Sequence, residues 1–600
     1  MTAGLITACA GADLEVEKLG VPVQIRELGI HVVTRKASGG HIAWGWRKQE
    51  GLVGVDVATG KTFELDMRKF RAVNVALARG PEGDLFFYVG TPGRFFKYTP
   101  QGELVELGTP DKTPAYWIGG HQSKNDILYV GTYPEATLVA CDLKTGESRS
   151  YGRLTKDMRE KYIIRVAAAD DGTVYSGVGL HHQELWALNP KTGEKRQILP
   201  EPMTSIQGSP RLWTGKDGHV YGKTGKTTYR CTPTSIEECK PVAERRDPTL
   251  KMAGNRKINS VDDQGRLQFA PSGSAGPSYV QTDYRGREPR VYCLGGERGG
   301  KLYGGTLFPG RPFTVDLKSG ELTEMRGAVP QVIQIYDIMN HPNGLFFASY
   351  MGCILDFLNP EAPRENKVNP IRFKTRIPGH ERPNQWELGP DGKLYFGTVP
   401  AKGRLGGALV QVDPDTRKVK VWDKIMPDLS IPYLASVSGA GLIFGCTSVG
   451  GGSSAIPTKE EAETFLWDTG AEKVVWTGKP VPGTRSYGRA ISAANGMIVG
   501  LAEQSWYLFD PETKETVHRG RLPVKRLRFP QLSDGLVGPK GWVVGIGDDK
   551  VFAIDAQTRE LRILGEHKTL NGVHGFHVTA DGTLFYGSHE TVYRCHLPLD

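Results

Sequence analysis

Short apolar segments recur along the whole chain at a nearly even spacing. Leu128-Tyr129-Val130-Gly131 is typical, with three large side chains followed by glycine. Successive segments begin 35 to 55 residues apart, mostly in the forties, and a period of this length predicts a repeat architecture. The thirteen segments begin at Ile42, Phe87, Leu128, Val174, Val220, Leu267, Leu302, Leu345, Leu394, Leu442, Met497, Trp542 and Leu584.

Most repeats contain the same parts in the same order. A β-rich segment such as 163–169 comes first, and a tight turn such as Asp171-Gly172 follows, whose glycine supplies the positive φ angle of a two-residue hairpin. The apolar strand, a loop of variable length and a third strand come next. A second turn, Lys144-Thr145-Gly146 in one repeat, then leads into a fourth strand. Four antiparallel strands in forty-odd residues predict the blade of a β-propeller.

The number of repeats predicts more than one domain. Thirteen four-stranded repeats exceed the ~4–8 blades of a typical propeller, so the expected fold is all-β with two propellers. A short spacing between the Leu267 and Leu302 segments, and the stretch near Pro330, place the boundary there. We expect about seven blades in residues 1–328 and six or seven in residues 329–600, with one blade completed by a strand from elsewhere in the chain.

Composition narrows the class of protein. Hydrophobic residues make up 39% and charged residues 24% of the 600 positions, as in a soluble globular protein. The net charge of +9 is mild, and without a Lys/Arg block it predicts no nucleic-acid partner. No apolar run approaches the ~20 residues of a membrane span. We expect a monomer without a transmembrane segment.

The cysteines bear on the cellular compartment. Ile6-Thr7-Ala8-Cys9 resembles a bacterial lipoprotein cleavage site, although a basic segment and a full apolar segment before it are missing. Cys231 and Cys239 flank a predicted hairpin turn and are candidates for a disulfide. An extracellular or periplasmic location is therefore expected, with a lipoprotein carrying an incomplete signal as one form of it.

Propeller topology selects the candidate site. Loops between second and third strands gather on one face near the axis, where variable loops form binding sites. The catalytic candidates come from two adjacent repeats and are His121, Tyr133, Tyr162, Arg165, His181 and His182. The candidate substrate-binding residues are Arg311, Arg382, Lys402 and Arg404.

Two His, two Tyr and an Arg in one sector suit β-elimination from a uronic acid. A cation offsets the sugar carboxylate and acidifies the C5 proton, a Tyr or His removes that proton, and another protonates the leaving oxygen. Each residue also has a structural alternative. His121 could be a core histidine, Tyr133 a loop cap, and one of His181 and His182 is expected to be structural, because neighbours in extended chain face opposite ways.

A second group of histidines lies near the end of the chain. His574, His577 and His589 could assemble as metal ligands, although residues three apart in a strand do not share a face. The sequence contains no Gly-x-Ser-x-Gly elbow and no Walker loop.

The stretches GTYPEATLVACDLKTGESRSYGRL (131–154) and YIIRVAAADDGTVYSGVGLHHQELWALNPKTGEKRQIL (162–199) resemble the β-propeller polysaccharide lyases, including ulvan lyases and rhamnose–glucuronate lyases. The resemblance implies His and Tyr as acid and base, with Arg or His facing the uronate. His121, Tyr162 or Tyr133, Arg165 and His182 match these residue types. Those lyases are mostly single seven-bladed propellers, whereas this chain contains nearly twice as many repeats.

The sequence therefore predicts a polysaccharide lyase that cleaves an anionic, uronic-acid-containing glycan by β-elimination. No cofactor is required for this chemistry, while a structural or catalytic divalent metal stays open. Two alternatives remain. One is a non-catalytic propeller that binds glycans or proteins, and the other is a metal-dependent lyase of the oligogalacturonate or streptogramin type.

Overall fold

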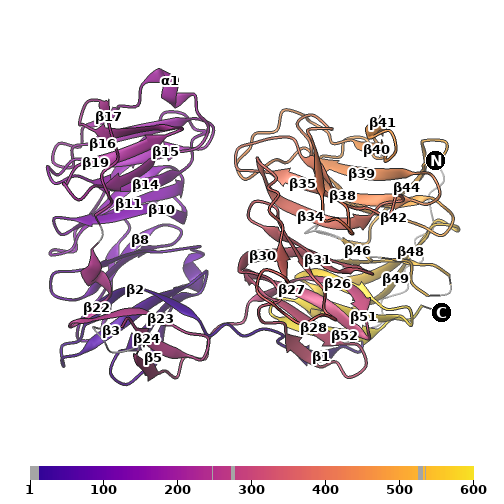
Figure 1. The fold of residues 1–600 in the computed structure, drawn as a ribbon, viewed down its shortest axis with the longest axis horizontal. Coiled ribbons are helices and arrows are strands. Elements are labelled where there is room, and N and C mark those ends of the chain that lie inside the picture. The colour runs from indigo at the N-terminus through magenta and orange to yellow at the C-terminus, as the bar shows by residue number, and fades with distance from the viewer. Residues whose placement is uncertain are drawn as a thin grey trace. The chain divides into compact units, whose positions relative to one another are not determined.

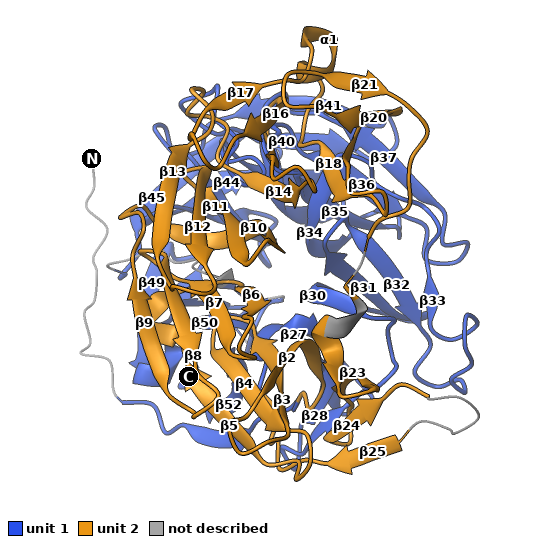
Figure 2. Cartoon of the chain, turned by 90° about the vertical axis from the view of Figure 1, so that its left-hand side faces the viewer, with its two compact units in different colours: residues 1–24, 288–600 blue, residues 25–287 orange. Residues whose placement is uncertain are grey.

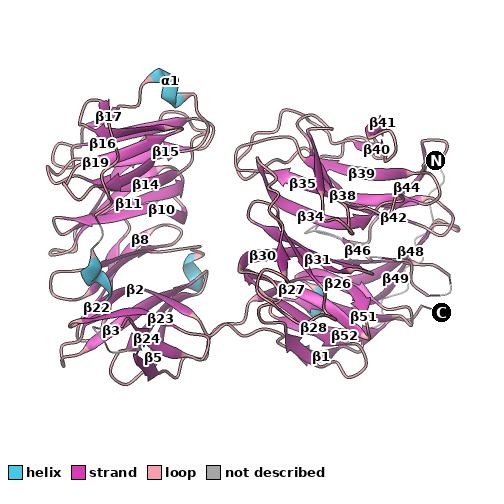
Figure 3. Cartoon of the chain, in the orientation of Figure 1, coloured by secondary structure: helices cyan, strands magenta, loops and turns pink. Residues whose placement is uncertain are grey.

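The computed structural model describes residues 13–245, 247–271, 278–524, 531–533, 535–538 and 540–599. Within these ranges the chain is built from antiparallel strands, with one short helix, α1 (Glu201–Thr204), and three 3-10 turns at Arg68–Phe70, Pro248–Lys251 and Lys568–Leu570 (Figure 3). The all-β prediction is confirmed. No helix in the described ranges is long and apolar enough to cross a membrane. The Cys9 site lies outside the described residues.

The chain forms two compact units, shown in different colours in Figure 2. Unit 2 is continuous and comprises residues 25–287. Unit 1 comprises residues 1–24 together with 288–600, so the whole of unit 2 is inserted into the sequence of unit 1.

Unit 2 contains six blade repeats, which follow one another along the chain. Its inner strands contact in the order β23, β2, β6, β10, β14 and β18. The blades are β2–β5 (Leu28–Arg35, His41–Arg47, Gly51–Asp56, Thr62–Asp66), β6–β9 (Ala76–Arg79, Leu85–Val89, Arg94–Tyr98, Leu104–Gly108), β10–β13 (Ala115–Lys124, Ile127–Pro134, Thr137–Asp142, Ser148–Arg153), β14–β17 (Ile163–Ala168, Val174–Gly179, Gln183–Leu188, Lys195–Gln197), β18–β21 (Arg211–Thr214, Val220–Thr224, Thr227–Cys231, Ile236–Glu238) and β22–β25 (Met252–Ala253, Arg256–Val261, Arg266–Phe269, Ser278–Gln281).

In the part of the chain that the structure describes, the strands of unit 1, several of which are labelled in Figure 1, form seven blade repeats. They are β26–β29 (Arg290–Arg298, Lys301–Gly310, Pro312–Asp316, Leu322–Glu324), β30–β33 (Val332–His341, Gly344–Tyr350, Ile354–Leu358, Ile371–Arg372), β34–β37 (His380–Leu388, Leu394–Pro400, Ala408–Val412, Val419–Asp423), β38–β41 (Ser430–Val437, Leu442–Ser448, Thr464–Asp468, Lys473–Gly478), β42–β45 (Tyr487–Ser492, Ile498–Ala502, Ser505–Asp510, Glu515–Arg521), β46–β49 (Gln531–Leu532, Val543–Gly547, Lys550–Asp555, Glu560–Glu566), and β50–β52 (Val573–Val578, Thr583–Ser588, Thr591–His596) with β1 (Glu17–Gly20).

The strand β1 closes the ring of unit 1. It pairs antiparallel with β52, with Glu17 opposite Arg594, and becomes the outermost strand of the last blade. The Arg594 guanidinium binds the Glu17 carboxylate at 2.5 Å. The inner strands β26 and β50, of the first and last blades, are in contact. One blade is thus completed by a strand from the far end of the chain, as the repeat count predicted.

The thirteen predicted repeats are present in the described residues, and each predicted apolar segment forms the strand next to the inner strand of its blade. Their division differs from the sequence-based boundary at 328/329, because residues 288–328 form the first blade of unit 1. Unit 2 therefore has six blades and unit 1 seven. A repeat pattern shows where blades begin but not which blade each one packs against, and that packing decides the boundary.

Close packing between neighbouring blades explains the glycine that ends the apolar segments. A Cβ at Gly131 of β11 would lie 2.3 Å from Ile163 of the next blade, and a Cβ at Gly587 of β51 would lie 2.2 Å from Val291 of β26. The apolar faces of adjacent blades then bury against each other, as Phe86 and Leu128 do in unit 2. Each large apolar side chain buried in this way contributes about 1.5–3 kcal/mol.

The predicted turns are also present. Gly172 has a φ of 92° between β14 and β15, a conformation that side-chain-bearing residues rarely adopt. In the turn from β12 to β13, the Asp142 carboxylate accepts hydrogen bonds from the backbone N–H groups of Lys144 and Thr145 at 2.8 and 3.0 Å.

The proposed disulfide between Cys231 and Cys239 is wrong, because both residues are free thiols. On the paired strands β20 and β21, Cys231 lies opposite Ile236, and the backbone N–H of Cys239 donates to Thr228. The two cysteines are thus offset by three residues along the ladder, roughly 10 Å, which a disulfide cannot bridge.

Candidate functional site

A cavity of about 630 Å³ lies among the inner strands of unit 1. Gly450 and Gly451, of the loop between β39 and β40, and Glu503, of the turn between β43 and β44, also line it. The cavity therefore lies toward the face that carries the second-to-third loops, where the sequence predicted ligand binding. Its volume is within the usual range for a small-molecule or oligosaccharide site.

Six inner strands of unit 1 each contribute at least one large polar or aromatic side chain to this cavity. These side chains include Tyr292 of β26, Tyr336 of β30, Arg382 of β34, Tyr433 of β38, Arg489 of β42 and His574 of β50. Radial repetition of one blade thus gathers residues that lie far apart in sequence around a single space.

Four of these residues lie in β-bulges. The register between first and second strands shifts across Tyr292, Tyr336, Arg489 and His574, none of which has a ladder partner there. A bulge breaks the regular alternation and re-aims the extra side chain. The bulges let these side chains line the cavity while the residues on either side keep the strand paired.

Aromatic rings form one wall of the cavity. The ring centroids of Tyr292 and Tyr336 are 5.1 Å apart, and Tyr350 lies 6.2 Å from Tyr336. The imidazole of His574 stacks on Tyr292 with a centroid distance of 5.2 Å. Such a wall can pack against the apolar face of a sugar ring while the hydroxyl groups form hydrogen bonds.

Arg382 lies beside this wall. Its guanidinium is 5.5 Å from the ring centroid of Tyr350, and Nη2 donates to the Ser453 hydroxyl in the loop between β39 and β40 at 2.9 Å. The planar guanidinium suits a carboxylate ligand because it can donate two parallel hydrogen bonds.

The pKa values of the two tyrosines Tyr292 and Tyr336 are both raised, but different neighbours act on them. Burial raises the pKa of Tyr292 well above its usual value. Burial also raises the pKa of Tyr336, to about 12, while the positive charge of Arg382 and a hydrogen bond with Tyr292 oppose the rise. Arg382 therefore stabilises the ionised form of Tyr336, and it acts in the same direction on Tyr350, whose pKa is raised mainly by burial.

The acidic groups at the cavity are held by backbone N–H groups. Asp337 accepts from the N–H of Trp386 at 2.8 Å and from that of Ile338 at 2.9 Å. Glu503 accepts from the N–H of Arg485 at 2.9 Å. These bonds give Asp337 and Glu503 structural roles at the rim.

In unit 2, two of the predicted catalytic residues are in contact. The rings of Tyr133 and Tyr162 stack with centroids 4.1 Å apart and an interplanar angle of 19°. Trp117 packs edge-on against Tyr162 at 5.6 Å. Tyr162 is buried, so this group forms a packed aromatic cluster between blades.

His181 and His182 lie in the loop between β15 and β16. The His182 ring is surrounded by carboxylates, with Nδ1 3.2 Å from Glu160 and Nε2 2.9 Å from Glu184. The backbone N–H groups of His181 and His182 donate to Glu160.

His121 and Arg165 lie on the inner strands β10 and β14. His121 pairs with Val130 four residues along β10 from Trp117, a separation of roughly 13 Å at 3.3 Å per residue. Desolvation by the surrounding protein and, to a smaller extent, the charge of nearby His31 lower the pKa of His121, although its side chain is exposed. Arg165 is exposed, and its guanidinium donates to the carbonyl of Ile164 at 3.3 Å. No contact in the described part of the chain joins His121 to Tyr133, Tyr162 or His182.

Of the predicted substrate-binding residues, Arg382 lines the cavity of unit 1. Arg311 lies between β27 and β28, and its backbone N–H and C=O bond to Thr306. Lys402 and Arg404 lie between β35 and β36, where the positive charge of Arg404 contributes to a lowered pKa of His380 that arises mainly from burial.

The C-terminal histidines have separate surroundings. His574 lines the cavity, while Nε2 of His577 lies 2.9 Å from the Glu297 carboxylate. Among the described residues, the group with metal-ligand proximity is Asp157, Glu160 and His182 instead.

Sequence reasoning did not select Tyr292, Tyr336, Tyr433 and Arg489. Their common feature is a place in the first strand of a blade, which the repeat alignment located. The signal that could have identified them is a large polar or aromatic residue there, but the bulges that direct them inward have no sequence signature.

The fold and cavity define a protein of two β-propeller units with an aromatic, arginine-containing cavity in the seven-bladed unit. No family model matches the chain, and no curated protein matches its sequence.

Among the solved structures that are similar to this chain are three that align over most of its length. An extracellular domain of a hybrid two component system, BT3049, from B. thetaiotaomicron aligns with a TM-score of 0.38 and 11% identity over 92% of this chain and 73% of that one. PorZ of the type-IX secretion system of Porphyromonas gingivalis aligns with a TM-score of 0.38 and 11% identity over 96% and 86%. An extracellular domain of a one component system, BT4673, from B. thetaiotaomicron aligns with a TM-score of 0.31 and 13% identity over 97% and 82%. With TM-scores this low, the alignments assign neither a family nor a function.

Proposed function

We propose that the cavity of unit 1 binds a uronic-acid-containing glycan and that the chain is a polysaccharide lyase acting there by β-elimination. The observation that carries this proposal is the placement of Arg382 beside Tyr336 and Tyr350 in a cavity that also contains Tyr292 and His574. Arginine, tyrosine and histidine are the residue types that this reaction needs.

Arg382 has the role of binding the uronate carboxylate. Its guanidinium neutralises the carboxylate and stabilises the negative charge that develops when C5 loses its proton. Arg489, on the inner strand of another blade, adds a second positive charge to the cavity. Two arginines on different blades favour a polyanion over a neutral sugar.

Tyr336 has the role of the base and Tyr292 that of the acid. The Tyr336 phenolate removes the C5 proton, the electron pair forms the C4–C5 double bond, and the C4–O4 bond breaks. The leaving oxygen takes a proton from Tyr292, whose raised pKa keeps it protonated. This assignment follows from Arg382, which favours the phenolate of Tyr336, and from the place of Tyr336 in the lining of the cavity, where Tyr350 is absent.

The test is turnover on a panel of ulvan, gum arabic, pectin and glycosaminoglycans. A lyase produces an unsaturated uronate, which is measured by its ultraviolet absorbance. Arg382→Gln should abolish the product, while Arg326→Gln, a matched change at an arginine paired with Glu324, should not. Turnover that persists in Arg382→Gln would exclude this cavity as the site.

A non-catalytic glycan-binding propeller is the second candidate. The raised pKa values of Tyr292 and Tyr336 favour it, because burial disfavours the phenolate that base catalysis requires and leaves both phenols as hydrogen-bond donors. This function requires saturable glycan binding that Arg382→Gln weakens, without any unsaturated product from the same panel.

A further inference from the structure

A cluster of metal-ligand side chains lies in unit 2, apart from the cavity of unit 1. Asp157 and Glu160 belong to the segment between β13 and β14, and His182 to the loop between β15 and β16. One ligand atom from each residue lies within 4.8 Å of the other two. The His182 Nδ1 atom is 3.2 Å from Glu160 Oε1 and 3.8 Å from Asp157 Oδ2.

Both ring nitrogens of His182 face carboxylate oxygens. Nε2 lies 2.9 Å from Glu184 Oε1, on the side opposite to Glu160 and Asp157. A neutral imidazole has only one N–H, so it can donate to one of the two sides and turns a lone pair toward the other. An imidazole that donates from Nε2 to Glu184 therefore turns the lone pair of Nδ1 toward Glu160 and Asp157, which is the geometry of a metal-bound histidine.

Glu184 holds the His182 imidazole in one orientation. Its Oε1 also accepts from the Thr155 hydroxyl at 2.9 Å, and its Oε2 accepts from the Trp186 indole at 2.7 Å. A carboxylate that receives the second N–H of a histidine is the usual outer partner of a metal-bound imidazole, because it sets the tautomer and the ring orientation. Here it would leave the lone pair on Nδ1.

Burial and backbone hydrogen bonds also hold the Glu160 carboxylate in place. Its side chain is completely buried, and the backbone N–H groups of His181 and His182 donate to Glu160 Oε1 at 2.9 and 3.1 Å. Burying a carboxylate is costly unless positive charge compensates it. The Nε2 atom of His181, next to these N–H groups, is buried and has no hydrogen-bond partner among the described residues.

We infer that Asp157, Glu160 and His182 form a divalent metal site of the Zn²⁺ class, with Nδ1 and two carboxylate oxygens as ligands and water completing the shell. Two ligands of a tetrahedral zinc ion at ~2.1 Å lie about 3.4 Å apart, which the 3.2 and 3.8 Å separations fit. The ion joins the segment before β14 to the loop after β15. Arg159 contacts both oxygens of Asp157 and competes with the ion for this carboxylate.

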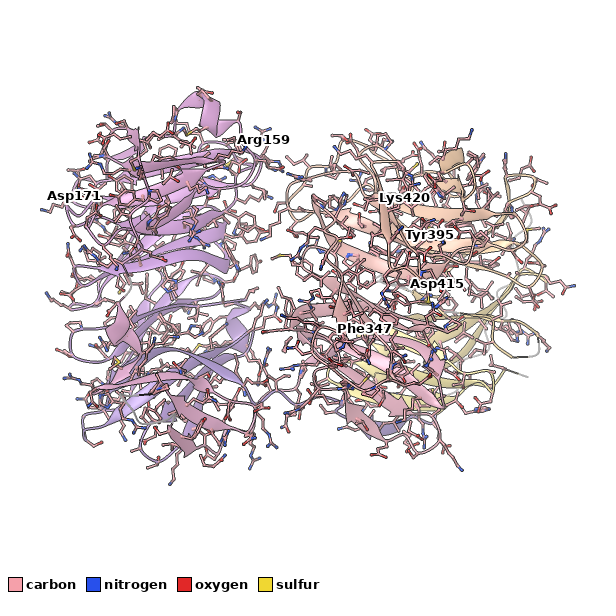
Figure 4. The ribbon with its side chains drawn as sticks, in the orientation of Figure 1. Arg159, Asp171, Phe347, Tyr395, Asp415 and Lys420 are labelled. Atoms are coloured by element: carbon pink, nitrogen blue, oxygen red, sulfur yellow. The ribbon has the colours of Figure 1, made fainter. Side chains whose placement is uncertain are left out.

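The site lies on the loop-bearing face of unit 2. In Figure 4, Arg159 lies at one edge of this unit, and Asp171, in the tight turn between β14 and β15, lies at the opposite edge. The short turns thus occupy one face and the metal ligands the other.

The test is isothermal titration of the full-length protein, stripped by a chelator and dialysed, with ZnCl₂. We expect one equivalent to bind. Asp157→Asn should weaken the affinity at least tenfold, and His182→Gln should abolish stoichiometric binding. Arg159→Gln should leave binding intact or strengthen it, because it removes the competing cation. Circular dichroism verifies that each variant is folded.

Asp171→Asn is the matched control for a carboxylate on the opposite face, and it should bind zinc like the unaltered protein. Absence of stoichiometric zinc binding would overturn the inference. Equal binding by Asp157→Asn and His182→Gln would show that zinc binds elsewhere, with the same consequence. Tighter binding of CaCl₂ than of ZnCl₂ would overturn the assignment to the zinc class.

Discussion

At the scale of single residues, arginine and tyrosine side chains lie side by side at the cavity of unit 1. Arg382 is the central residue, because it stacks near Tyr350, bonds to Ser453 and influences the ionisation of Tyr336. Removal of the hydroxyl group of one tyrosine can therefore distinguish its role in proton transfer from its role in substrate binding.

Tyr336→Phe removes the proposed base and keeps the ring in the aromatic wall. We expect kcat on a uronate polymer to fall about 10²–10⁴-fold, the usual contribution of general acid–base catalysis, with little change in KM. Tyr593→Phe, at a half-buried tyrosine of β52 that stacks on Tyr586 of β51, is the matched control and should retain activity. A Tyr336→Phe variant with undiminished kcat would remove this residue from the mechanism.

The ionisation of the Tyr336 phenol determines the expected pH dependence of turnover. Burial raises the pKa of Tyr336 to about 12, so only a small fraction is ionised at neutral pH and this fraction grows as pH rises. The initial rate should therefore increase steadily from pH 7 to pH 10 wherever the protein stays folded. A rate that falls over this range would contradict the assignment of Tyr336 as the base.

At the scale of elements, strand pairing determines both the site and the closure of unit 1. Bulges in β26, β30, β42 and β50 direct side chains into the cavity, and the neighbouring ladder positions hold each strand in place. The pairing of β1 with β52 supplies the outermost strand of the last blade.

A chain that begins at residue 21 lacks β1 and tests this closure. Without β1 the edge of β52 is unpaired and the Glu17–Arg594 ion pair is lost, so unit 1 should unfold at a temperature several degrees lower. A chain that begins at residue 13 keeps β1 and is the control. Calorimetry of both chains provides the measurement, and equal melting of the two would show that β1 contributes nothing to closure.

At the scale of the whole molecule, two propeller units each have their own inner strands. The candidate catalytic cavity belongs to unit 1 and the candidate metal site to unit 2. The residues chosen from sequence for catalysis lie in unit 2, while Arg382, chosen for substrate binding, lies in unit 1. Variants in the two units therefore distinguish which propeller acts on the glycan.

We expect His121→Gln in unit 2 to leave turnover unchanged and Arg382→Gln in unit 1 to abolish it. The physical reason is that His121 makes no described contact with the tyrosines or histidines that the sequence grouped with it. Initial rates on the same polymer measure both variants. The reverse result, with His121 essential and Arg382 dispensable, would assign the activity to unit 2.

Much of the fold was predictable, because its blades recur in the sequence at a nearly even spacing. The segments such as Leu128–Gly131 are the second strands of blades, because buried strands need apolar residues and close blade packing needs glycine. The site was less predictable. The place of Arg382 at the start of a first strand predicts its position at the site. The adjacency of two blades groups His121 with Tyr162 and His182, but adjacency does not fix distance along a strand.

The sequence by itself determined the all-β architecture, the thirteen blades and the face on which ligands are expected. These features depend on local patterns of apolar strands and turns, and the patterns recur in the repeats. Only the tertiary structure decided that β1 joins β52, that the blade of residues 288–328 belongs to unit 1, and that Tyr292, Tyr336, Arg382 and His574 share one cavity. These features depend on which strands pair and where bulges interrupt the ladder, and such contacts join residues that lie hundreds of positions apart.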